Sequence, residues 1–175
     1  RRETNVIAGL QSPHTGYLYD FGTAQDGRFY YVMELLDGIS LQTLITTFGP
    51  QPAARVIFIL RQMCQSLDEA HEQGLIHRDL KPSNVMICKV AQQHDFVKVL
   101  DFGLAKSIEP DAMSRVTVEG LTAGTPGYMA PEVALGNPNV DGRADLYAVG
   151  CLAYGLLAGT EGFTGTNPVG GGLKD

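Results

Sequence analysis

The stretch His77-Arg78-Asp79-Leu80-Lys81-Pro82-Ser83-Asn84 is the most informative part of this 175-residue chain. It places an acid, basic residues and an amide within eight positions, and the triplet Asp101-Phe102-Gly103 begins seventeen residues after Asn84. An Asp-x-Lys pair alone is usually a surface ion pair, and an Asp-Phe-Gly triplet alone is usually a turn. Their joint occurrence, with the strand-like run Val97-Lys98-Val99-Leu100 between them, specifies many residue types at once and indicates a functional site.

This constellation indicates the transfer of a phosphoryl group from a nucleotide. Such a reaction needs positioned phosphates, metal ions that offset charge, and an oriented hydroxyl nucleophile. Asp79 can accept a hydrogen bond from that hydroxyl, and Lys81 can place a positive charge beside the transferred group. Asn84 offers a neutral oxygen ligand and Asp101 a charged one, the hard donors that Mg²⁺ prefers. We therefore predict Asp79, Lys81, Asn84 and Asp101 as catalytic residues, with Asn84 and Asp101 as metal ligands.

Length and composition favour one globular domain, since 44% of the 175 residues are hydrophobic. The formal net charge of -6 and the absence of a basic block argue against non-specific binding of nucleic acid. The three cysteines, Cys64, Cys88 and Cys151, form no Cys-x-x-Cys pair and have apolar neighbours. We expect buried free thiols in a reducing compartment, because neither these residues nor the four histidines have the spacing of a zinc site.

No signal peptide opens the sequence, so we expect the domain to be cytoplasmic, with membrane anchoring of a longer parent protein left open. The longest apolar run, residues 148–158, is interrupted by Gly150 and Gly155. It is too short for a bilayer, which needs about 20 residues, and a buried helix explains it better.

The periodicity of apolar residues predicts several elements along the chain. Residues 1–10 have a helical pattern, and two strands at 17–21 and 29–36 flank a turn at Asp26-Gly27, which predicts an antiparallel hairpin. A long helix follows Pro52 and ends at Gly74, and a second spans residues 143–158 before Gly159. Between them lie short strands at 85–88 and 96–100. Residues 101–132 read as a long ordered loop, which is usually functional.

At the residues quoted first, the chain resembles the eukaryotic-type protein kinases. Lys81 favours the serine/threonine branch, because tyrosine kinases usually have alanine or arginine there. The run GTPGYMAPE at 124–132 is similar to the end of a kinase activation segment, and DLYAVG at 145–150 resembles the buried helix that supports the catalytic loop. The residues of both runs are typical of the bacterial members of this kinase family. The resemblance extends from residue 1 to about 163 and implies ATP-dependent phosphorylation of serine or threonine in a protein substrate, with ATP and Mg²⁺.

The resemblance also implies a nucleotide site. Glu3 matches the helix glutamate that pairs with a phosphate-binding lysine, and Ile7 and Leu18 then fall in a stack with Phe102 and His77. Met33 falls at the gatekeeper position. The adenine would contact backbone groups of Glu34 and Leu36, with the side chain of Met86 beneath the ring, while Lys81 and Asp101 would face the phosphates. Met33 and Met86 are equally compatible with a plain core role.

Further residues match regulatory and structural positions of the family. Arg78 precedes the catalytic aspartate, an arrangement that goes with control by phosphorylation of the activation loop. Thr117 and Thr122 are the candidate phosphosites, with Ser114 as a further one, and each is equally readable as an ordinary polar loop residue. Thr125 matches the threonine that holds the catalytic aspartate and lysine. Asp145 matches a buried anchor of the catalytic-loop backbone, and Glu132 matches the glutamate that pairs with a distant arginine.

Some parts of the family pattern do not occur in these 175 residues. No Gly-x-Gly-x-x-Gly loop or Val-Ala-x-Lys strand precedes Glu3, and Tyr147 stands where tryptophan is frequent. We therefore expect an α+β, protein-kinase-like fold truncated at both ends. Residues 1–36 would form the remnant of a small β-rich N-lobe and the start of the hinge, 37–163 a mostly helical C-lobe, and 164–175 a flexible tail. This stretch alone should be nearly inactive and marginally stable.

Two other functions are compatible with parts of this pattern. A pseudokinase or ATP-binding regulatory module would use the fold without chemistry, although Asp79, Asn84 and Asp101 are all intact. A small-molecule phosphotransferase of the aminoglycoside or choline type would share the fold. Such enzymes usually lack the Ala-Pro-Glu segment that ends at Glu132.

Overall fold

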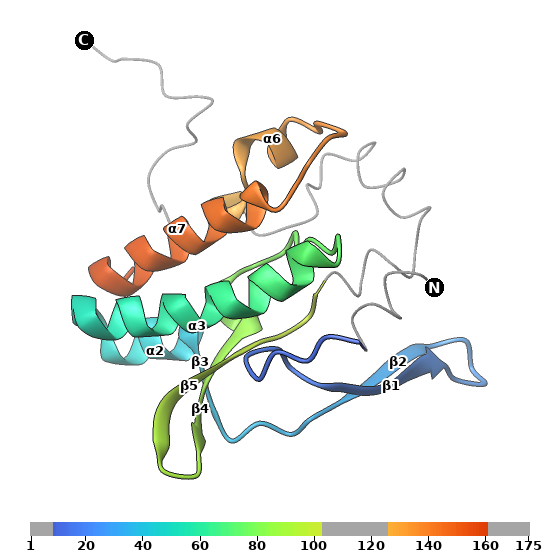
Figure 1. Cartoon of the computed structure of the whole chain (residues 1–175), viewed down its shortest axis with the longest axis horizontal. Helices are drawn as coiled ribbons and strands as arrows, with labels where there is room; N and C mark the ends of the chain where they lie inside the picture. Colours follow the sequence, from blue (N-terminus) through green and yellow to red (C-terminus); the bar gives the residue numbers. More distant parts are fainter. Residues whose placement is uncertain (1–8, 103–125, 161–175) are drawn as a thin grey trace.

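A β-hairpin, a three-stranded sheet and a layer of helices make up the computed structural model, which describes residues 9–102 and 126–160 (Figure 1). The elements follow in the order β1 (Leu18–Thr23), β2 (Phe29–Met33), β3 (Gly38–Ser40), α2 (Leu41–Phe48), α3 (Ala53–Glu72), the 3-10 helix η1 (Pro82–Asn84), β4 (Val85–Val90), β5 (Gln93–Val99), the 3-10 helix η2 (Pro126–Tyr128), α6 (Pro131–Ala134) and α7 (Arg143–Ala158). Mixed helices and small antiparallel sheets confirm the expected α+β class.

Helix α3 is the centre of the packing, because it contacts β5 on one side and α7 on the other (Figure 1). Its buried apolar residues recur every three or four positions, which is the stripe expected of an amphipathic helix: Val56, Ile59, Met63, Leu67 and Ala70. The helix ends before Gly74, whose φ of 73° is in the left-handed region. Both long helices therefore begin and end where the sequence pattern predicted them.

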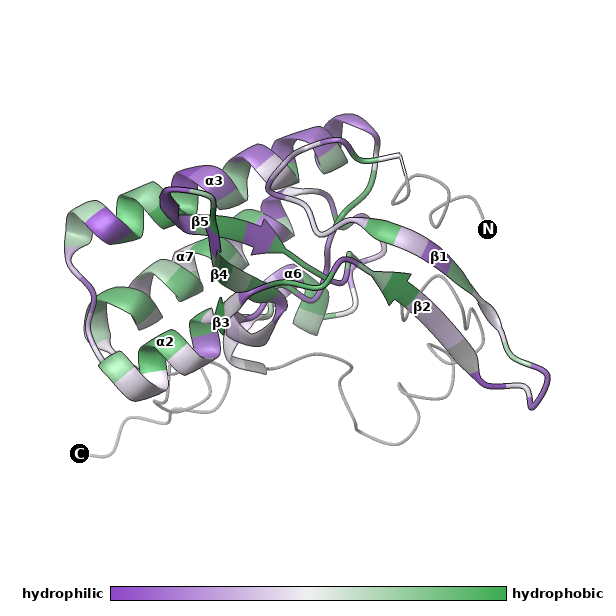
Figure 2. Cartoon of the chain, turned by 90° about the horizontal axis from the view of Figure 1, so that it is seen from below, coloured by the Kyte–Doolittle hydropathy of each residue, from purple (hydrophilic) through white to green (hydrophobic). Residues whose placement is uncertain are grey.

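The hairpin of β1 and β2 is antiparallel, as predicted, and Phe21 pairs with Tyr31. Its turn is hydrophilic and extends away from the helical layer (Figure 2). The expected second strand was too long, however, because β2 ends at Met33 rather than at residue 36. After Glu34, which still donates its N–H to the Tyr17 carbonyl at 3.0 Å, the chain leaves the hairpin towards β3 and Leu35 is 99% exposed.

The sequence pattern missed β3 and α2. Strand β3 pairs antiparallel with β4, and β4 pairs with β5. Ser40 caps the N-terminus of α2, because its hydroxyl accepts the Thr43 N–H at 3.1 Å, and Gly49 caps the C-terminus with a φ of 66°. These two caps were visible in the sequence as a serine and a glycine nine positions apart, but eight helical residues are too few for a clear period.

The segment before β1 joins the hairpin to the three-stranded sheet. Thr15 forms a parallel bridge with Val99 of β5, and the Gly16 N–H donates to the Val99 carbonyl at 2.8 Å. The Val99 N–H in turn donates to the His14 carbonyl at 2.8 Å. A Cβ at Gly16 would lie 2.5 Å from Leu100 Cδ2, so a larger residue here would require the end of the Leu100 side chain to shift.

Two expectations about burial need correction. Cys64 is exposed on α3, whereas Cys88 and Cys151 are buried, and all three are free thiols. Cys64 lies one position beyond Met63 and so falls off the buried stripe of the helix. Helix α7 buries only one side, because Leu146, Tyr154 and Leu157 remain exposed. None of the described helices is long and apolar enough to cross a membrane.

Two glycines, Gly150 within α7 and Gly159 at its C-terminal cap, offer a matched test of the fold. Gly159 ends the helix with a φ of 69°, and a Cβ there would lie 2.5 Å from Pro50 Cδ and 2.6 Å from Pro50 N. Gly159→Ala should therefore destabilise the protein by at least about 1–2 kcal/mol, the cost of a left-handed alanine before any clash. Gly150 lies in the helix interior, where a Cβ would meet nothing within 4 Å. Gly150→Ala should stabilise by about 0.5–1 kcal/mol.

The measurement is the urea midpoint of the full-length protein, compared at constant m-value. Equal midpoints for Gly159→Ala and the wild type would contradict the structural role of the αL cap at Gly159.

Candidate active site

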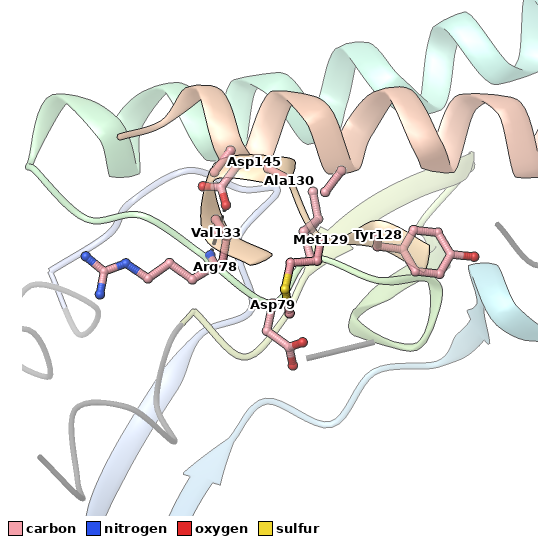
Figure 3. A pocket seen from close by; sticks show the side chains of 10 residues that line it. Arg78, Asp79, Tyr128, Met129, Ala130, Val133 and Asp145 are labelled. Atoms are coloured by element: carbon pink, nitrogen blue, oxygen red, sulfur yellow. Dashed lines mark hydrogen bonds between the residues drawn. The ribbon is translucent and has the colours of Figure 1, made fainter. Parts of the chain in front are cut away.

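The loop between α3 and η1 is held by one buried carboxylate. Asp145, at the start of α7, is 1% exposed and accepts the backbone N–H groups of His77 at 2.8 Å and Arg78 at 2.9 Å. Figure 3 shows Asp145 and Arg78 at this loop. His71 of α3 donates from Nε2 to the same carboxylate at 2.8 Å. Arg78 has a φ of 64°, which costs a non-glycine residue about 1–2 kcal/mol. The hydrogen bonds to Asp145 thus hold a backbone conformation that would otherwise be unfavourable.

Asp79 follows directly and presents its carboxylate beside Lys81. Lys81 Nζ donates to Asp79 Oδ2 at 2.7 Å, and both side chains are about one-third exposed, so they face solvent from a partly enclosed position. Asn84 Nδ2 donates to the Asp79 backbone carbonyl at 3.0 Å. The loop therefore brings together an acid, an adjacent cation and an amide whose oxygen accepts the Ser83 hydroxyl at 3.4 Å.

The β4–β5 hairpin places Asn84 beside Asp101. Val85 pairs with Val99, and the next residues continue this register, since the Leu100 N–H donates to the Asn84 carbonyl at 2.8 Å. Asn84, directly before β4, and Asp101, directly after Leu100, consequently lie at the same end of the hairpin. One antiparallel ladder therefore brings together Asn84 and Asp101, which are seventeen positions apart in the sequence.

The Asp101 carboxylate lies in an environment that favours a bound cation. Burial raises its pKa, and the nearby Asp79 carboxylate acts in the same direction, whereas His77 and Lys81 oppose the rise. Within residues 9–102 and 126–160 this carboxylate makes no hydrogen bond or ion pair. A half-buried carboxylate at the same end of the hairpin as the Asn84 amide is a pair of oxygen donors that suits Mg²⁺ with phosphate and water as further ligands.

His77 is a buried structural residue of this loop. Burial lowers its pKa, which favours the neutral ring. Its Nε2 donates to the Leu100 carbonyl at 2.8 Å, and its Nδ1 accepts the Asp79 N–H at 3.3 Å, as the neutral tautomer requires. The ring packs on Phe102 with centroids 4.8 Å apart, and Leu18 belongs to the same buried core. These contacts fix the catalytic-loop segment against the end of β5.

The residues expected to face a nucleotide lie where the two sheets approach each other. Met33 ends β2, and Glu34 and Leu36 follow it on the connection to β3. Met86 lies on β4, opposite Ser40 of β3 and Lys98 of β5. Because the Glu34 N–H is occupied by the Tyr17 carbonyl, its own carbonyl is the backbone group left for a ligand.

A small pocket lies between the catalytic loop, the segment after η2 and the first turns of α7. Figure 3 shows Asp79 and Met129 close together and the Arg78 side chain extending away from them. The lining comes from the following residues: Arg78, Asp79, Leu80, Tyr128, Met129, Ala130, Val133, Ala144, Asp145 and Ala148. Helix α6 carries Glu132, which is half-buried.

Comparison with known proteins identifies this arrangement. The family model of the protein kinase domain matches residues 1–170. The chain belongs to the protein kinase family. Serine/threonine-protein kinase pkn2 of Myxococcus xanthus is 41% identical over 168 residues, which cover 96% of this chain and 20% of the relative. PknB of Mycobacterium tuberculosis is 40% identical over 172 residues, covering 97% of this chain and 26% of the relative.

Solved kinase structures confirm the fold. The crystal structure of Rad53 1-466 in complex with AMP-PNP is 30% identical, with a TM-score of 0.74, and the match covers 96% of this chain and 40% of that one. This kinase chain thus spans about a quarter or less of the length of the curated relatives above. The resemblance to bacterial serine/threonine kinases in the sequence analysis is confirmed.

Several predicted kinase residues lie outside the described part of the chain. They are Glu3, Ile7, Ser114, Thr117, Thr122 and Thr125, together with the predicted helix at the start of the chain and the expected tail at 164–175. Among the described residues, Asp79, Lys81 and Asn84 lie together on one loop, and Asp101 joins them through the β4–β5 hairpin.

Two residues of this kinase site were not singled out in the sequence. His71 contacts Asp145 across 74 positions, and Lys98 contacts Glu34 across 64 positions. Neither pair has a local signature, because His71 reads as one more polar residue of α3 and Lys98 as the polar position of an alternating strand. Only the packing of α3 against α7, and of the connection after β2 against β5, brings each pair together.

Asp145→Asn tests the anchor of the loop. An asparagine keeps one acceptor oxygen but introduces an NH₂ group among three donors, so at least one buried N–H loses its partner. We expect a loss of about 2–4 kcal/mol in the free energy of unfolding, measured by urea titration of the full-length protein. The control is Asp141→Asn, an exposed carboxylate paired with Arg143, which should not change the midpoint. An unchanged midpoint for Asp145→Asn would show that the loop does not depend on this carboxylate.

Proposed function

We propose that the full-length protein is an ATP-dependent serine/threonine protein kinase. The observation that supports this best is the joint placement of four residues: Asp79 held by Lys81 at 2.7 Å, and Asn84 brought beside Asp101 by the β4–β5 register. Proteins named serine/threonine kinases match almost the whole chain at about 40% identity. The substrate would be a protein with a serine or threonine acceptor.

In this proposal Asp79 orients the acceptor hydroxyl and accepts its proton. The hydroxyl oxygen forms a new bond to the γ-phosphorus of ATP, the bond from that phosphorus to the β-phosphate oxygen breaks, and ADP leaves with the electron pair. Lys81 holds the Asp79 carboxylate in place and offsets negative charge at the transferred group. The protein contributes chiefly position and charge, which is what phosphoryl transfer requires.

The ATP phosphates would be held together with Mg²⁺ at Asn84 and Asp101. Asn84 has its NH₂ group committed to the Asp79 carbonyl, and its oxygen accepts only the Ser83 hydroxyl at 3.4 Å among the described residues, so a lone pair of that oxygen can bind the metal. The metal would neutralise charge on the phosphates when bound. The adenine would lie between Met33, Met86 and the backbone at Glu34 and Leu36, and Glu3 would belong to the same site through its pairing with a lysine.

We also infer that this chemistry takes place in the cytoplasm, which supplies ATP. Three free thiols are compatible with a reducing compartment. A pseudokinase or ATP-binding regulatory module is the alternative function, and the intact Asp79, Asn84 and Asp101 argue against it. We propose that residues 1–175 alone have little activity.

Asp79→Asn in the full-length protein should lower the rate of phosphate incorporation by about 10²–10⁴-fold, because the side chain can no longer accept the hydroxyl proton. The assay follows transfer of labelled γ-phosphate from ATP to a generic protein substrate. The control is Asp68→Asn, an exposed carboxylate on α3, which should retain wild-type turnover. Turnover at the wild-type level in Asp79→Asn would refute the role given to Asp79. A wild-type protein that transfers no phosphate would instead favour the regulatory-module alternative.

Arg78 offers a site for control by phosphorylation. Its side chain is exposed, and among the described residues its guanidinium has no hydrogen bond or ion pair. A cation fixed at its backbone by Asp145 is well placed to bind an anion. We propose that phosphate on Thr117 or Thr122 is that anion and that Thr125 helps to hold Asp79 and Lys81.

Mass spectrometry of the full-length protein after incubation with ATP and Mg²⁺ should find phosphate on Thr117 or Thr122. Combined replacement of both threonines by alanine should lower activity about 5–150-fold, a loss of about 1–3 kcal/mol from charge-assisted hydrogen bonds. The same replacement should have little further effect in an Arg78→Gln background, because the anion and its partner act together. Phosphate found only at other positions would contradict this assignment.

A further inference from the structure

Lys98 joins three segments that are far apart in the sequence. Its Nζ donates to Glu34 Oε1 at 2.6 Å and to the Thr15 carbonyl at 3.3 Å. Glu34 Oε1 also accepts the Tyr17 N–H at 2.8 Å, and the Glu34 N–H donates to the Tyr17 carbonyl at 3.0 Å. One ammonium group of β5 therefore ties the start of β1 to the residue that follows β2.

This ion pair is more enclosed than an ordinary surface pair. The side chains of Lys98 and Glu34 are only 14% and 21% exposed. Screening by water is reduced at such a site, and each side chain is fixed by a second hydrogen bond. Removal of either charge would leave the other partly desolvated and without its partner. The pair therefore acts as a rigid joint between segments.

The joint lies at the part of the molecule expected to hold the nucleotide base. Lys98 and Met86 are direct cross-strand partners, so their side chains stand on the same face of the β4–β5 ladder. Glu34 is both the partner of Lys98 and a residue whose backbone carbonyl accepts no hydrogen bond from residues 9–102 and 126–160. The two walls of the adenine site, β4 and the connection after β2, are thus connected through Lys98.

We propose that Lys98 is a positioning residue for nucleotide binding, which sets the distance between the connection at residues 33–36 and the floor formed by Met86. This inference rests on the proposed ATP site. The bridge acts before any chemistry, so its loss weakens ATP binding and leaves the transfer step largely intact. Such a loss of uniform binding raises KM at constant kcat.

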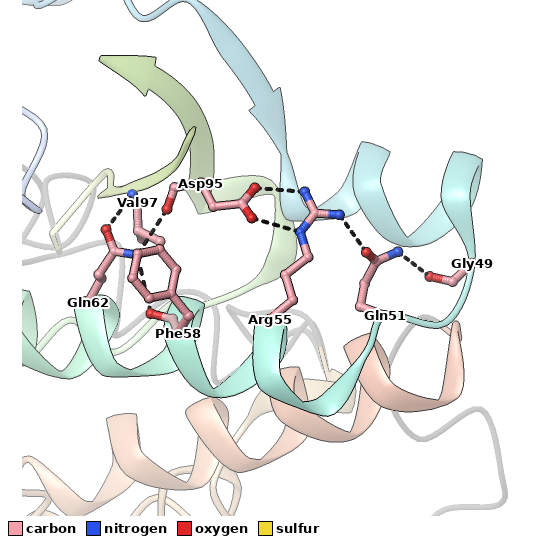
Figure 4. Close-up of polar contacts among 7 residues, drawn as sticks. All are labelled: Gly49, Gln51, Arg55, Phe58, Gln62, Asp95 and Val97. Atoms are coloured by element: carbon pink, nitrogen blue, oxygen red, sulfur yellow. Dashed lines mark hydrogen bonds and ion pairs between the residues drawn. The ribbon is translucent and has the colours of Figure 1, made fainter. Parts of the chain in front are cut away.

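A second ion pair of the same strand supplies a matched control. Arg55 of α3 donates from Nε and Nη2 to the Asp95 carboxylate at 3.0 and 2.7 Å, and Gln51 accepts from Arg55 Nη1 at 2.7 Å (Figure 4). The side chains of Arg55 and Asp95 are 35% and 25% exposed. This pair also ties β5 to another element, but it lies about 10 Å further along the strand, towards the β4–β5 turn.

The experiment compares Lys98→Met, Glu34→Gln, their double variant and Arg55→Met in the full-length protein. Glu34→Gln keeps an oxygen for the Tyr17 N–H and loses only the charge. The first measurement is hydrogen exchange of the Tyr17 and Glu34 amides without ligand, which should be about five- to tenfold faster in Lys98→Met. The second is the Kd for ATP with Mg²⁺, which should rise about five- to tenfold in either single variant.

The comparison of hydrogen exchange and ATP affinity among the variants tests the positioning role of Lys98. The double variant should weaken ATP binding no more than the single ones, because one interaction is lost in each case. Arg55→Met should leave both readouts unchanged, even where it lowers the melting temperature. Unchanged exchange and Kd in Lys98→Met, or an equal rise in Kd in Arg55→Met, would overturn the inference. Wild-type protein that binds ATP but transfers no phosphate would refute the kinase proposal alone, since the binding pattern would still stand.

Discussion

The carboxylate of Asp145 is the interaction on which the candidate site depends. A charge that is 1% exposed survives only with its lone pairs satisfied, and here two backbone N–H groups and His71 satisfy them. Those two N–H groups belong to the residues directly before Asp79. The same bonds that make the buried charge tolerable therefore fix the backbone from which the proposed catalytic acid projects. Stability and active-site geometry are coupled through one side chain.

The β4–β5 hairpin is the second constraint. Its ladder brings Asn84 and Asp101 together, while its outer edge is occupied by the segment before β1 at Val99. Helix α3 supports the hairpin from behind and also carries His71 to Asp145. The same strand, β5, carries Lys98 to Glu34. The proposed catalytic loop, metal ligands and nucleotide site all depend on one sheet edge and one helix, so a displacement of β5 would move residues in all three.

Much of the fold could be predicted because its strongest elements are long and periodic. The helices α3 and α7 and the hairpin of β1 and β2 follow directly from apolar spacing and from glycines at their ends. Strand β3 and helix α2 could not be found, because three and eight residues are too short for a period to emerge. The exposure of Cys64 and of one side of α7 was not predicted. Hydropathy describes the tendency of a residue to be buried, but it does not show which other elements pack against that residue.

The sequence by itself indicated the proposed chemistry, because an acid, a lysine, an amide and a second acid in this order and spacing are the residue types that phosphoryl transfer uses. It also determined the family, through motifs that specify many residue types at once. Only the tertiary structure decided which distant residues support them. The pairs His71–Asp145 and Lys98–Glu34 span 74 and 64 positions. No local pattern encodes such contacts, because they arise from the packing of elements whose sequences are individually ordinary.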